Sequence, residues 1–301
     1  MLAIAFSGHE LRYIQWERSG DEVRLLASQV IPWGREINPF RDVARVRDLL
    51  QKIIAEAGTS DGTPVYITLD AAFCHFAVQQ VDPEWDTEEQ LDSIQRGRFG
   101  SEPLYASFQF PLDDGAGDYL NVDCPMVLRR AVETALPTTS EVAHFLSIGL
   151  FSAHSYAQRV VPALDRGSRL FWRSSADGSE QFLEIRHGAF RALHFFQRTP
   201  DDVRHLRTIG NGRLVEPIAE FVRQLQDGQN AIFPEVDNVF VYLGSGDTAF
   251  LEEVLAVEQS TLSLLNPFWR WNWPEVPEAD NRFTQSAFTE LADAIWAVQD
   301  V

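Results

Sequence analysis

The sequence predicts an α/β protein of two lobes in which one unit of secondary structure occurs twice. Apolar or alternating segments of strand length and amphipathic segments of helix length follow one another along the chain. The order β-β-β-α-β at the N-terminus returns after residue 165 as β-β-β-α-β-α. With 301 residues, the chain is long enough for two cores, one in each repeat.

The first unit fills the first quarter of the chain. Strands are expected at Leu2–Phe6, Leu11–Glu17, Val23–Val30 and Val65–Leu69, because these segments are apolar or alternate between apolar and polar residues. Between the third and fourth strands, Val43–Ala57 has apolar residues at helical spacing and is followed by Gly58. This unit therefore reads as a three-stranded meander, a crossover helix and a further strand.

Residues 72–130 read as an insertion into the first lobe. We expect a helix at Thr87–Phe99, with Thr87 as its N-cap and Gln90 completing a capping box. Strands are expected at Phe73–Val81, Ser107–Leu112 and Tyr119–Val122.

The second unit follows a predicted helix at Ser152–Leu164. Three strands are expected at Ser168–Arg173, Gln181–Arg186 and Ala189–Gln197. The later elements are helices at Leu214–Leu225, Thr248–Val257 and Ser286–Ala297 and strands at Val239–Leu243 and Leu262–Leu265.

The chain is strongly acidic, with 44 Asp and Glu against 25 Lys and Arg and a net charge of −19. This balance argues against nucleic acid and anionic lipid as partners, since both need a basic surface. Lys52 is the single lysine, which together with the acidity suggests a halophilic habitat, with codon bias as the alternative. The sequence has no apolar run of membrane-spanning length and no basic leader at its start, so we expect a cytoplasmic protein.

The duplication resembles the actin-like (ribonuclease H-like) fold, and more closely the PilM branch, the cytoplasmic actin-like component of type IV pilus assembly, with its type II secretion relatives. The matching segments are Leu2–Gly8, Asp86–Phe99, Ser147–Phe151, Leu243–Gly246 and Leu264–Phe268, in the family's order. The resemblance implies a first lobe at 1–164 with its insertion at about 72–130 and a second lobe at 165–283. It also implies that a C-terminal helix at 284–301 packs back on the first lobe.

In this fold the two lobes clasp a nucleotide, and the resemblance places Ser7, Gly8, Gly244, Ser245 and Gly246 at the phosphate-binding turns. Active relatives carry an Asp two residues before the first Gly, where this chain has Phe6. The end of the corresponding second-lobe strand, Leu170–Ser175, has bulky side chains and lacks the expected pattern of an Asp, a Gly and a hydroxyl residue. Without carboxylates to position magnesium in these two segments we expect no catalytic residues, no ATP hydrolysis and no bound cofactor. Phe6 and Trp172 could fill the cleft.

The turn at Gly244–Gly246 and the histidines are two further candidates for a binding site. Gly244–Gly246 could cradle a phosphate at a helix start, but a plain strand-to-helix turn with Asp247 as N-cap is favoured. The seven histidines show no metal-binding spacing, so no metal site is expected.

The resemblance implies a protein partner, the cytoplasmic tail of a single-pass inner-membrane protein. By position its groove involves Ile67–Phe76 and the helix at Leu91–Phe99. Trp269, Trp271 and Trp273 form an aromatic cluster that either binds a partner or fastens an irregular connection to the lobe.

We therefore expect a catalytically silent actin-like assembly protein of a pilus or secretion system. The alternatives are an actin-like ATPase or kinase that binds nucleotide between its lobes, and an unrelated duplicated binding protein.

Overall fold

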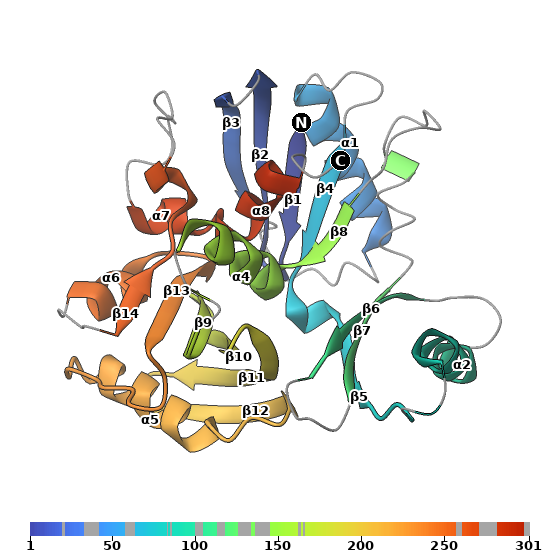
Figure 1. The fold of residues 1–301 in the computed structure, drawn as a ribbon. Coiled ribbons are helices and arrows are strands. Elements are labelled where there is room, and N and C mark those ends of the chain that lie inside the picture. Colours follow the sequence, from blue (N-terminus) through green and yellow to red (C-terminus); the bar gives the residue numbers. More distant parts are fainter. Residues whose placement is uncertain are drawn as a thin grey trace.

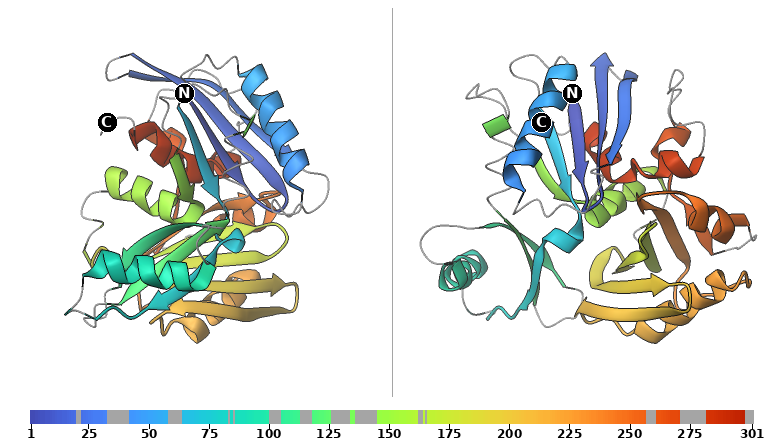
Figure 2. Two further views of the ribbon diagram at one scale, coloured as in Figure 1. Left: turned by 90° about the vertical axis from the view of Figure 1, so that its right-hand side faces the viewer. Right: turned by 180° about the vertical axis from the view of Figure 1, so that it is seen from behind.

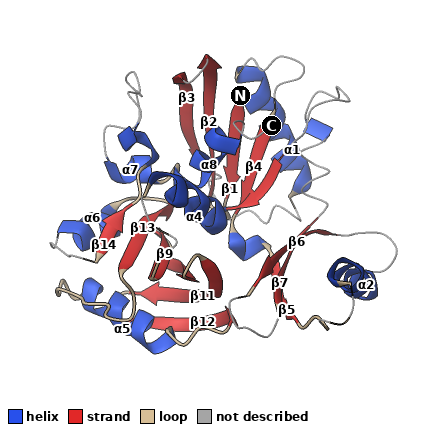
Figure 3. Ribbon diagram, in the orientation of Figure 1, coloured by secondary structure: helices blue, strands red, loops and turns tan. Residues whose placement is uncertain are grey.

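Three β-sheets organise the chain (Figure 1). The structure is a computed structural model that describes residues 1–19, 22–32, 42–57, 64–82, 84, 86–99, 105–112, 118–125, 134–135, 145–161, 164, 166–256, 261–270 and 282–297. Figure 3 separates its helices from its strands and shows two large sheets in different parts of the molecule, with a smaller sheet beside them.

The sheet of the first lobe has the strand order β3-β2-β1-β4-β8. Its strands are β1 (Leu2–Phe6), β2 (Glu10–Ser19), β3 (Glu22–Pro32), β4 (Val65–Leu69) and β8 (Phe145–Ile148). The meander β1–β2–β3 pairs antiparallel, while β1, β4 and β8 run parallel. All five residues of β1 and of β4 are buried, as expected for central strands covered on both faces.

The sheet of the second lobe repeats this order as β12-β11-β10-β9-β13-β14. Its strands are β9 (Ser168–Ser175), β10 (Ser179–Arg186), β11 (Ala189–Thr199), β12 (Asp202–Gly210), β13 (Asn238–Ser245) and β14 (Leu262–Leu264). The first four strands pair antiparallel, and β9, β13 and β14 run parallel. The two lobes therefore share one topology, to which the second lobe adds β12 at its edge.

The inserted subdomain lies between β4 and β8. It holds the sheet β5-β7-β6, made of β5 (His75–Gln79), β6 (Tyr105–Pro111) and β7 (Tyr119–Pro125), and the helix α2 (Thr87–Phe99). The 3-10 helix η1 (Ala71–Phe73) joins it to β4. In Figure 1 and in both views of Figure 2, α2 lies on the side of this sheet that faces away from the two large sheets.

Helices cover both faces of each large sheet. In the first lobe, α1 (Val43–Glu56) buries its apolar stripe on one face, and α8 (Thr289–Ala297) packs on β1 and β4 at the other. In the second lobe, α5 (Val215–Gln226) and α6 (Ala249–Ala256) cover one face, with Trp172 and Phe221 in their core. The helix α4 (Gly149–Val160) contacts strands of both sheets and so joins the lobes.

Two expectations about strands are corrected. The strand β12 was not predicted, because its apolar residues Val203, Leu206 and Ile209 recur every third position. Its register with β11 shifts between Phe195 and Phe196, and this bulge breaks the two-residue alternation of a strand. The expected strand at Phe73–Val81 begins only at His75, since η1 occupies its start.

The ends of two helices also differ from expectation. At the start of α2, Asp86 Oδ1 accepts the N–H of Glu89 at 3.0 Å, and Gln90 binds the backbone of Asp82. The helix expected at Ser286–Ala297 begins only at Thr289, as α8, and Ser286 is instead the last residue of a separate helix, α7 (Arg282–Ser286), where its buried hydroxyl accepts the N–H of Leu243.

No helix among the described residues combines the length and the apolar character needed to cross a bilayer.

The aromatic core of the second lobe gives a direct test of the packing. Phe221 of α5 is fully buried and contacts the rings of Trp172 and Phe233. We expect Phe221→Ala to lower the free energy of unfolding by about 3–5 kcal/mol, because it leaves a cavity between helix and sheet. The matched control is Ile232→Ala at a 71% exposed position, expected to change stability by less than about 0.5 kcal/mol. Urea unfolding measures both, and equal losses would contradict the packing.

Candidate functional site between the lobes

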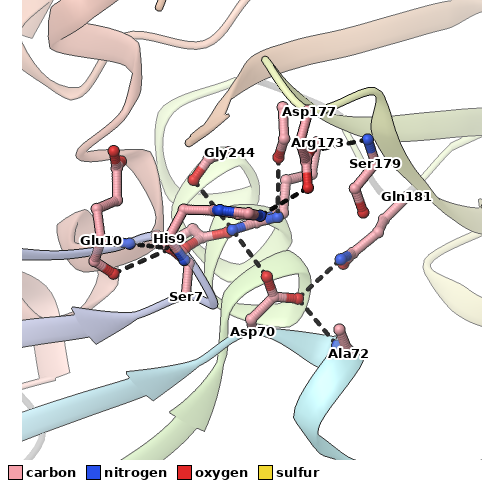
Figure 4. A network of polar contacts seen from close by, with 12 residues as sticks. Ser7, His9, Glu10, Asp70, Ala72, Arg173, Asp177, Ser179, Gln181 and Gly244 are labelled. Atoms are coloured by element: carbon pink, nitrogen blue, oxygen red, sulfur yellow. Dashed lines mark hydrogen bonds and ion pairs between the residues drawn. The ribbon is translucent and has the colours of Figure 1, made fainter. Parts of the chain in front are cut away.

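Five segments meet where the carboxyl ends of the central strands of both lobes face each other. Figure 4 shows this region with Ser7, Asp70, Arg173 and Gly244 labelled. They are the β1–β2 turn with Ser7 and Glu10, Asp70 after β4, the β9–β10 turn, the end of β13 at Gly244 and the start of α8 at Glu290. In open α/β sheets this edge is the usual place for a ligand.

Arg12 of β2 crosses from the first lobe to the second. Its guanidinium is fully buried and donates to the carbonyl oxygens of Leu243 (3.3 Å), Gly244 and Ala287. Its Nε lies 3.3 Å from Glu10 and one terminal nitrogen lies 3.5 Å from Glu290. The end of β13 is thereby tied to the first lobe by a charged side chain.

Arg173 of β9 makes the reciprocal connection from the second lobe. Its Nε donates to Glu290 Oε1 at 2.7 Å, and its Nη2 reaches both Asp70 Oδ2 (3.0 Å) and the carbonyl of Gly244 (3.0 Å). Burial lowers the pKa of Arg173, but the carboxylates of Asp70 and Glu290 outweigh this effect and raise the pKa above its ordinary value. Arg173 therefore stays charged.

Glu290 supplies the carboxylate between the two arginines. It is 1% exposed, and its Oε1 also accepts the hydroxyl of Tyr242 at 3.0 Å. Burial, followed by the charge of Glu290, raises the pKa of Tyr242 well above its ordinary value, so the phenol remains a donor. A Cβ on Gly149 would lie 2.4 Å from Oε1, which shows that the carboxylate sits against the first residue of α4. Helix N-termini favour such an anion.

Glu10 occupies the glycine-rich turn after β13. The N–H of Gly246 donates to Glu10 Oε2 at 3.1 Å, so a carboxylate of the chain itself takes the place where a phosphate was considered. Gly246 has φ +82° and a Cβ there would lie 2.4 Å from Ala176, so the turn requires glycine. Asp247 accepts the N–H of Ala249 at 3.1 Å where α6 begins, as a plain strand-to-helix turn would have it.

Asp70 completes the network from the first lobe. Its Oδ1 accepts the N–H of Ala72 (2.9 Å) and the side-chain amide of Gln181 in β10 (2.7 Å), while Oδ2 faces Arg173. Both oxygens are therefore engaged within the protein. Among the described residues, no group of three or more His, Cys, Asp or Glu side chains is arranged to hold a metal ion.

The first turns of the two lobes also touch. His9 Nε2 lies 2.7 Å from Asp177 Oδ2, joining the β1–β2 turn to the β9–β10 turn at an exposed position. Ser7 is buried, donates to the carbonyl of Glu10 and accepts its N–H, so its hydroxyl is used to close its own turn.

Together these contacts form what we call the interlobe network: Arg12, Arg173, Glu10, Asp70 and Glu290. Two guanidinium groups face three carboxylates, and each of the five residues is at least 94% buried. Breaking such a network leaves a buried uncompensated charge, which costs about 3–5 kcal/mol. Chemically the arrangement holds the lobes together and presents no uncovered nucleophile or base.

The sequence-predicted residues fall partly within this region. Ser7, Gly244, Ser245 and Gly246 lie beside the network, and Gly8 is in the turn between Ser7 and His9. Their roles here are turn formation and backbone contacts to the network. The expected groove segment Ile67–Phe76 comprises the end of β4, η1 and the start of β5.

The expectation that Trp172 fills the space between the lobes is wrong, because Trp172 packs on Phe182 and Phe221 in the core of the second lobe. Phe6 is buried in a hydrophobic core that contains residues of both lobes. The network residues were missed, although Arg12 lies between Leu11 and Tyr13 and Arg173 directly follows the apolar run Leu170–Trp172.

The aromatic cluster lies mainly outside the described residues. Trp271 and Trp273 are in that category, and of Trp269 only the backbone is described, in the 3-10 helix η2 (Pro267–Arg270). The partner role considered for them stays a prediction.

Comparison with known proteins gives a structural match without a sequence match. No protein-family model and no curated protein sequence matches the chain. Among solved structures, the PilM-PilN type IV pilus biogenesis complex aligns with 16% identity and a TM-score of 0.56 over 99% of this chain and 98% of the other. The chain has an actin-like fold.

Two further solved structures align at lower similarity. An actin-like ATPase-fold protein of unknown function from Bacteroides thetaiotaomicron covers 88% of this chain and 90% of its own, with 11% identity and a TM-score of 0.42. The cytoplasmic domain of EpsL, an inner-membrane component of the Vibrio cholerae type II secretion system, covers 98% and 94%, with 10% identity and a TM-score of 0.44.

The contact of Gly149 with Glu290 predicts a specific mutational effect. Gly149→Ala places a methyl group against the Glu290 carboxylate and should lower the free energy of unfolding by about 3 kcal/mol. The matched control is Gly97→Ala in α2, where a Cβ meets nothing within 4 Å and helix propensity should add up to about 1 kcal/mol. Chemical denaturation distinguishes the two, and a neutral Gly149→Ala would argue against a fixed carboxylate there.

His154 of α4 predicts a pH dependence of stability. Burial against Phe171 lowers the pKa of His154 from 6.5 to about 4. Between these values the unfolded chain binds more protons, so this residue's contribution is complete above pH 6.5 and is lost as the pH falls to about 4. The loss amounts to about 3 kcal/mol. Denaturation from pH 7 to 4 should show this slope in the wild type and a shallower one in His154→Phe; identical slopes would contradict the assignment.

Proposed function

We propose that this protein is an actin-like scaffold of a pilus or secretion system that acts without hydrolysing ATP. The observation that carries the proposal is the interlobe network, in which Arg12, Arg173 and Glu290 are buried between the strand ends of the two lobes. Phosphoryl transfer needs a metal and a phosphate in that position, with carboxylates free to position them. Here the carboxylates face arginines of the same chain.

The network also opposes the movement that nucleotide binding uses in two-lobed proteins. Opening the lobes would separate Arg12 from Gly244 and Arg173 from Asp70, exposing charges that are compensated only in the closed arrangement. We infer that the lobes act as one rigid body on which other proteins assemble.

The assembly role is supported by structural likeness. The PilM-PilN type IV pilus biogenesis complex has the same fold over nearly the whole of both chains. By this analogy we propose the cytoplasmic tail of a single-pass inner-membrane protein as partner, which would hold the protein at the cytoplasmic face of the inner membrane. Fold likeness alone does not fix function, so the partner is a separate point to test.

Calorimetry and thermal unfolding with ATP and magnesium test whether a nucleotide binds between the lobes. A ligand present at a hundred times its dissociation constant would add about 2.7 kcal/mol of stability, so even weak binding is visible at millimolar nucleotide. We expect neither heat nor a rise in melting temperature. Saturable binding with turnover would instead favour the alternative of an actin-like ATPase or kinase.

The partner is tested by expressing the chain with the cytoplasmic segment of a single-pass membrane protein encoded beside it. Co-purification of that segment, and not of a scrambled version, is expected. Failure of both versions to bind would contradict the proposed assembly role, but not the proposal that the protein does not hydrolyse ATP.

A further inference from the structure

The strand β5 of the inserted subdomain is an edge strand that lacks the usual protection against pairing. Exposed edges invite another strand, and proteins block them with bulges, charged side chains, proline or short length. Among the described strands, the edges β3 and β12 both contain a bulge and carry arginine, while β8 and β14 have only four and three residues. The other edge of the inserted sheet, β6, ends at Pro111 and continues into a bridge between Leu112 and Phe190.

By contrast, β5 has no bulge, no proline, and no arginine, lysine or carboxylate along its five residues. Its sequence is His-Phe-Ala-Val-Gln, and it pairs with β7 in unbroken register from His75 to Gln79. Val78 is 40% exposed and His75 is also exposed. The strand thus offers one row of backbone donors and acceptors and an uncovered apolar side chain.

One arginine of β12, Arg207, lies beside β5, and a second, Arg204, precedes it by three residues in the same strand. Arg204 and Arg207 of β12 are exposed and have no carboxylate within ion-pair distance among the described residues. The guanidinium carbon of Arg207 lies 4.2 Å from the ring centre of Phe195 and 5.8 Å from that of Phe76 in β5. In Figures 1 and 2, β5 and β12 lie at the same end of the molecule. A chain of net charge −19 has carboxylates in excess, yet these two cations are left uncompensated.

Phe76 fixes the orientation of β5. Its ring contacts Phe195, so Phe76, and with it Val78 two residues on, faces the second lobe and the arginines. A strand added to the free edge of β5 would place every second side chain on that same face. Acidic side chains there would meet Arg204 and Arg207, and apolar ones would cover Val78.

We propose that β5 binds an extended acidic segment of a partner protein by strand addition. Backbone hydrogen bonds to β5 supply the affinity, and Arg204 and Arg207 select for carboxylates, which arginine binds through two parallel hydrogen bonds. β12 cannot serve as the template, because its bulge at Leu206 interrupts the ladder. The inference does not rest on the pilus or secretion role and concerns any protein partner.

Two blocked, fluorescein-labelled octapeptides test the proposal, one of alternating Glu and Val and one of alternating Lys and Val. Fluorescence anisotropy with the full chain should give at least about tenfold tighter binding of the Glu-Val peptide, and the preference should weaken with salt. Hydrogen exchange should show protection of the β5 amides on binding. The double variant Arg204→Glu/Arg207→Glu should reverse the preference between the peptides.

The control compares two exposed edge positions. Val78→Glu should abolish binding of the Glu-Val peptide, whereas Leu26→Glu on the bulged edge of β3, at 46% exposure, should leave it unchanged. Equal affinity for both peptides, insensitivity to the arginine reversal or protection at β3 or β12 would each overturn the proposal. So would concentration-dependent sedimentation of the free protein that Val78→Glu suppresses, since the edge would then bind a second copy of the chain.

Discussion

The carboxylate of Glu290, held between Arg12 and Arg173, is the interaction on which the arrangement of the two lobes depends. It comes from α8 at the end of the chain, whereas the arginines come from the second strand of the first lobe and the first strand of the second. Three remote parts of the sequence are thus fixed at one buried point. Ionic groups so deeply buried contribute little net stability, but each strongly penalises the loss of its partners.

This constraint underlies the scaffold role that we propose for the protein. Two places that could hold an anion are taken by carboxylates of the chain. Glu10 accepts the N–H of Gly246 in the glycine-rich turn after β13, and Glu290 lies against Gly149 at the start of α4. A phosphate would have to displace them and leave them unpaired in a dry environment. Asp70 contacts both η1, which leads into the inserted subdomain, and Arg173 of the second lobe.

Much of the fold could be predicted from hydrophobic period and order of elements, because each lobe buries its strands on both faces. β12 escaped prediction because its bulge replaces the period of two by one of three. The network escaped because it depends on which strand ends face each other across the lobes, and periodicity carries no such information. Arg12 and Arg173 each follow an apolar residue in their strands, but Glu290 lies 278 and 117 residues from them in sequence, and Asp70 lies 103 residues from Arg173. The sequence identified the glycine-rich turn at Gly244–Gly246, but it did not show that Glu10 accepts the N–H of Gly246 there.

The most direct test is a crystal structure of the protein grown with millimolar ATP and magnesium. The account predicts Glu290 between Arg12 and Arg173, Glu10 on the N–H of Gly246 and no nucleotide between the lobes. A phosphate on Gly246, with Glu10 or Glu290 turned away from its arginine, would contradict it.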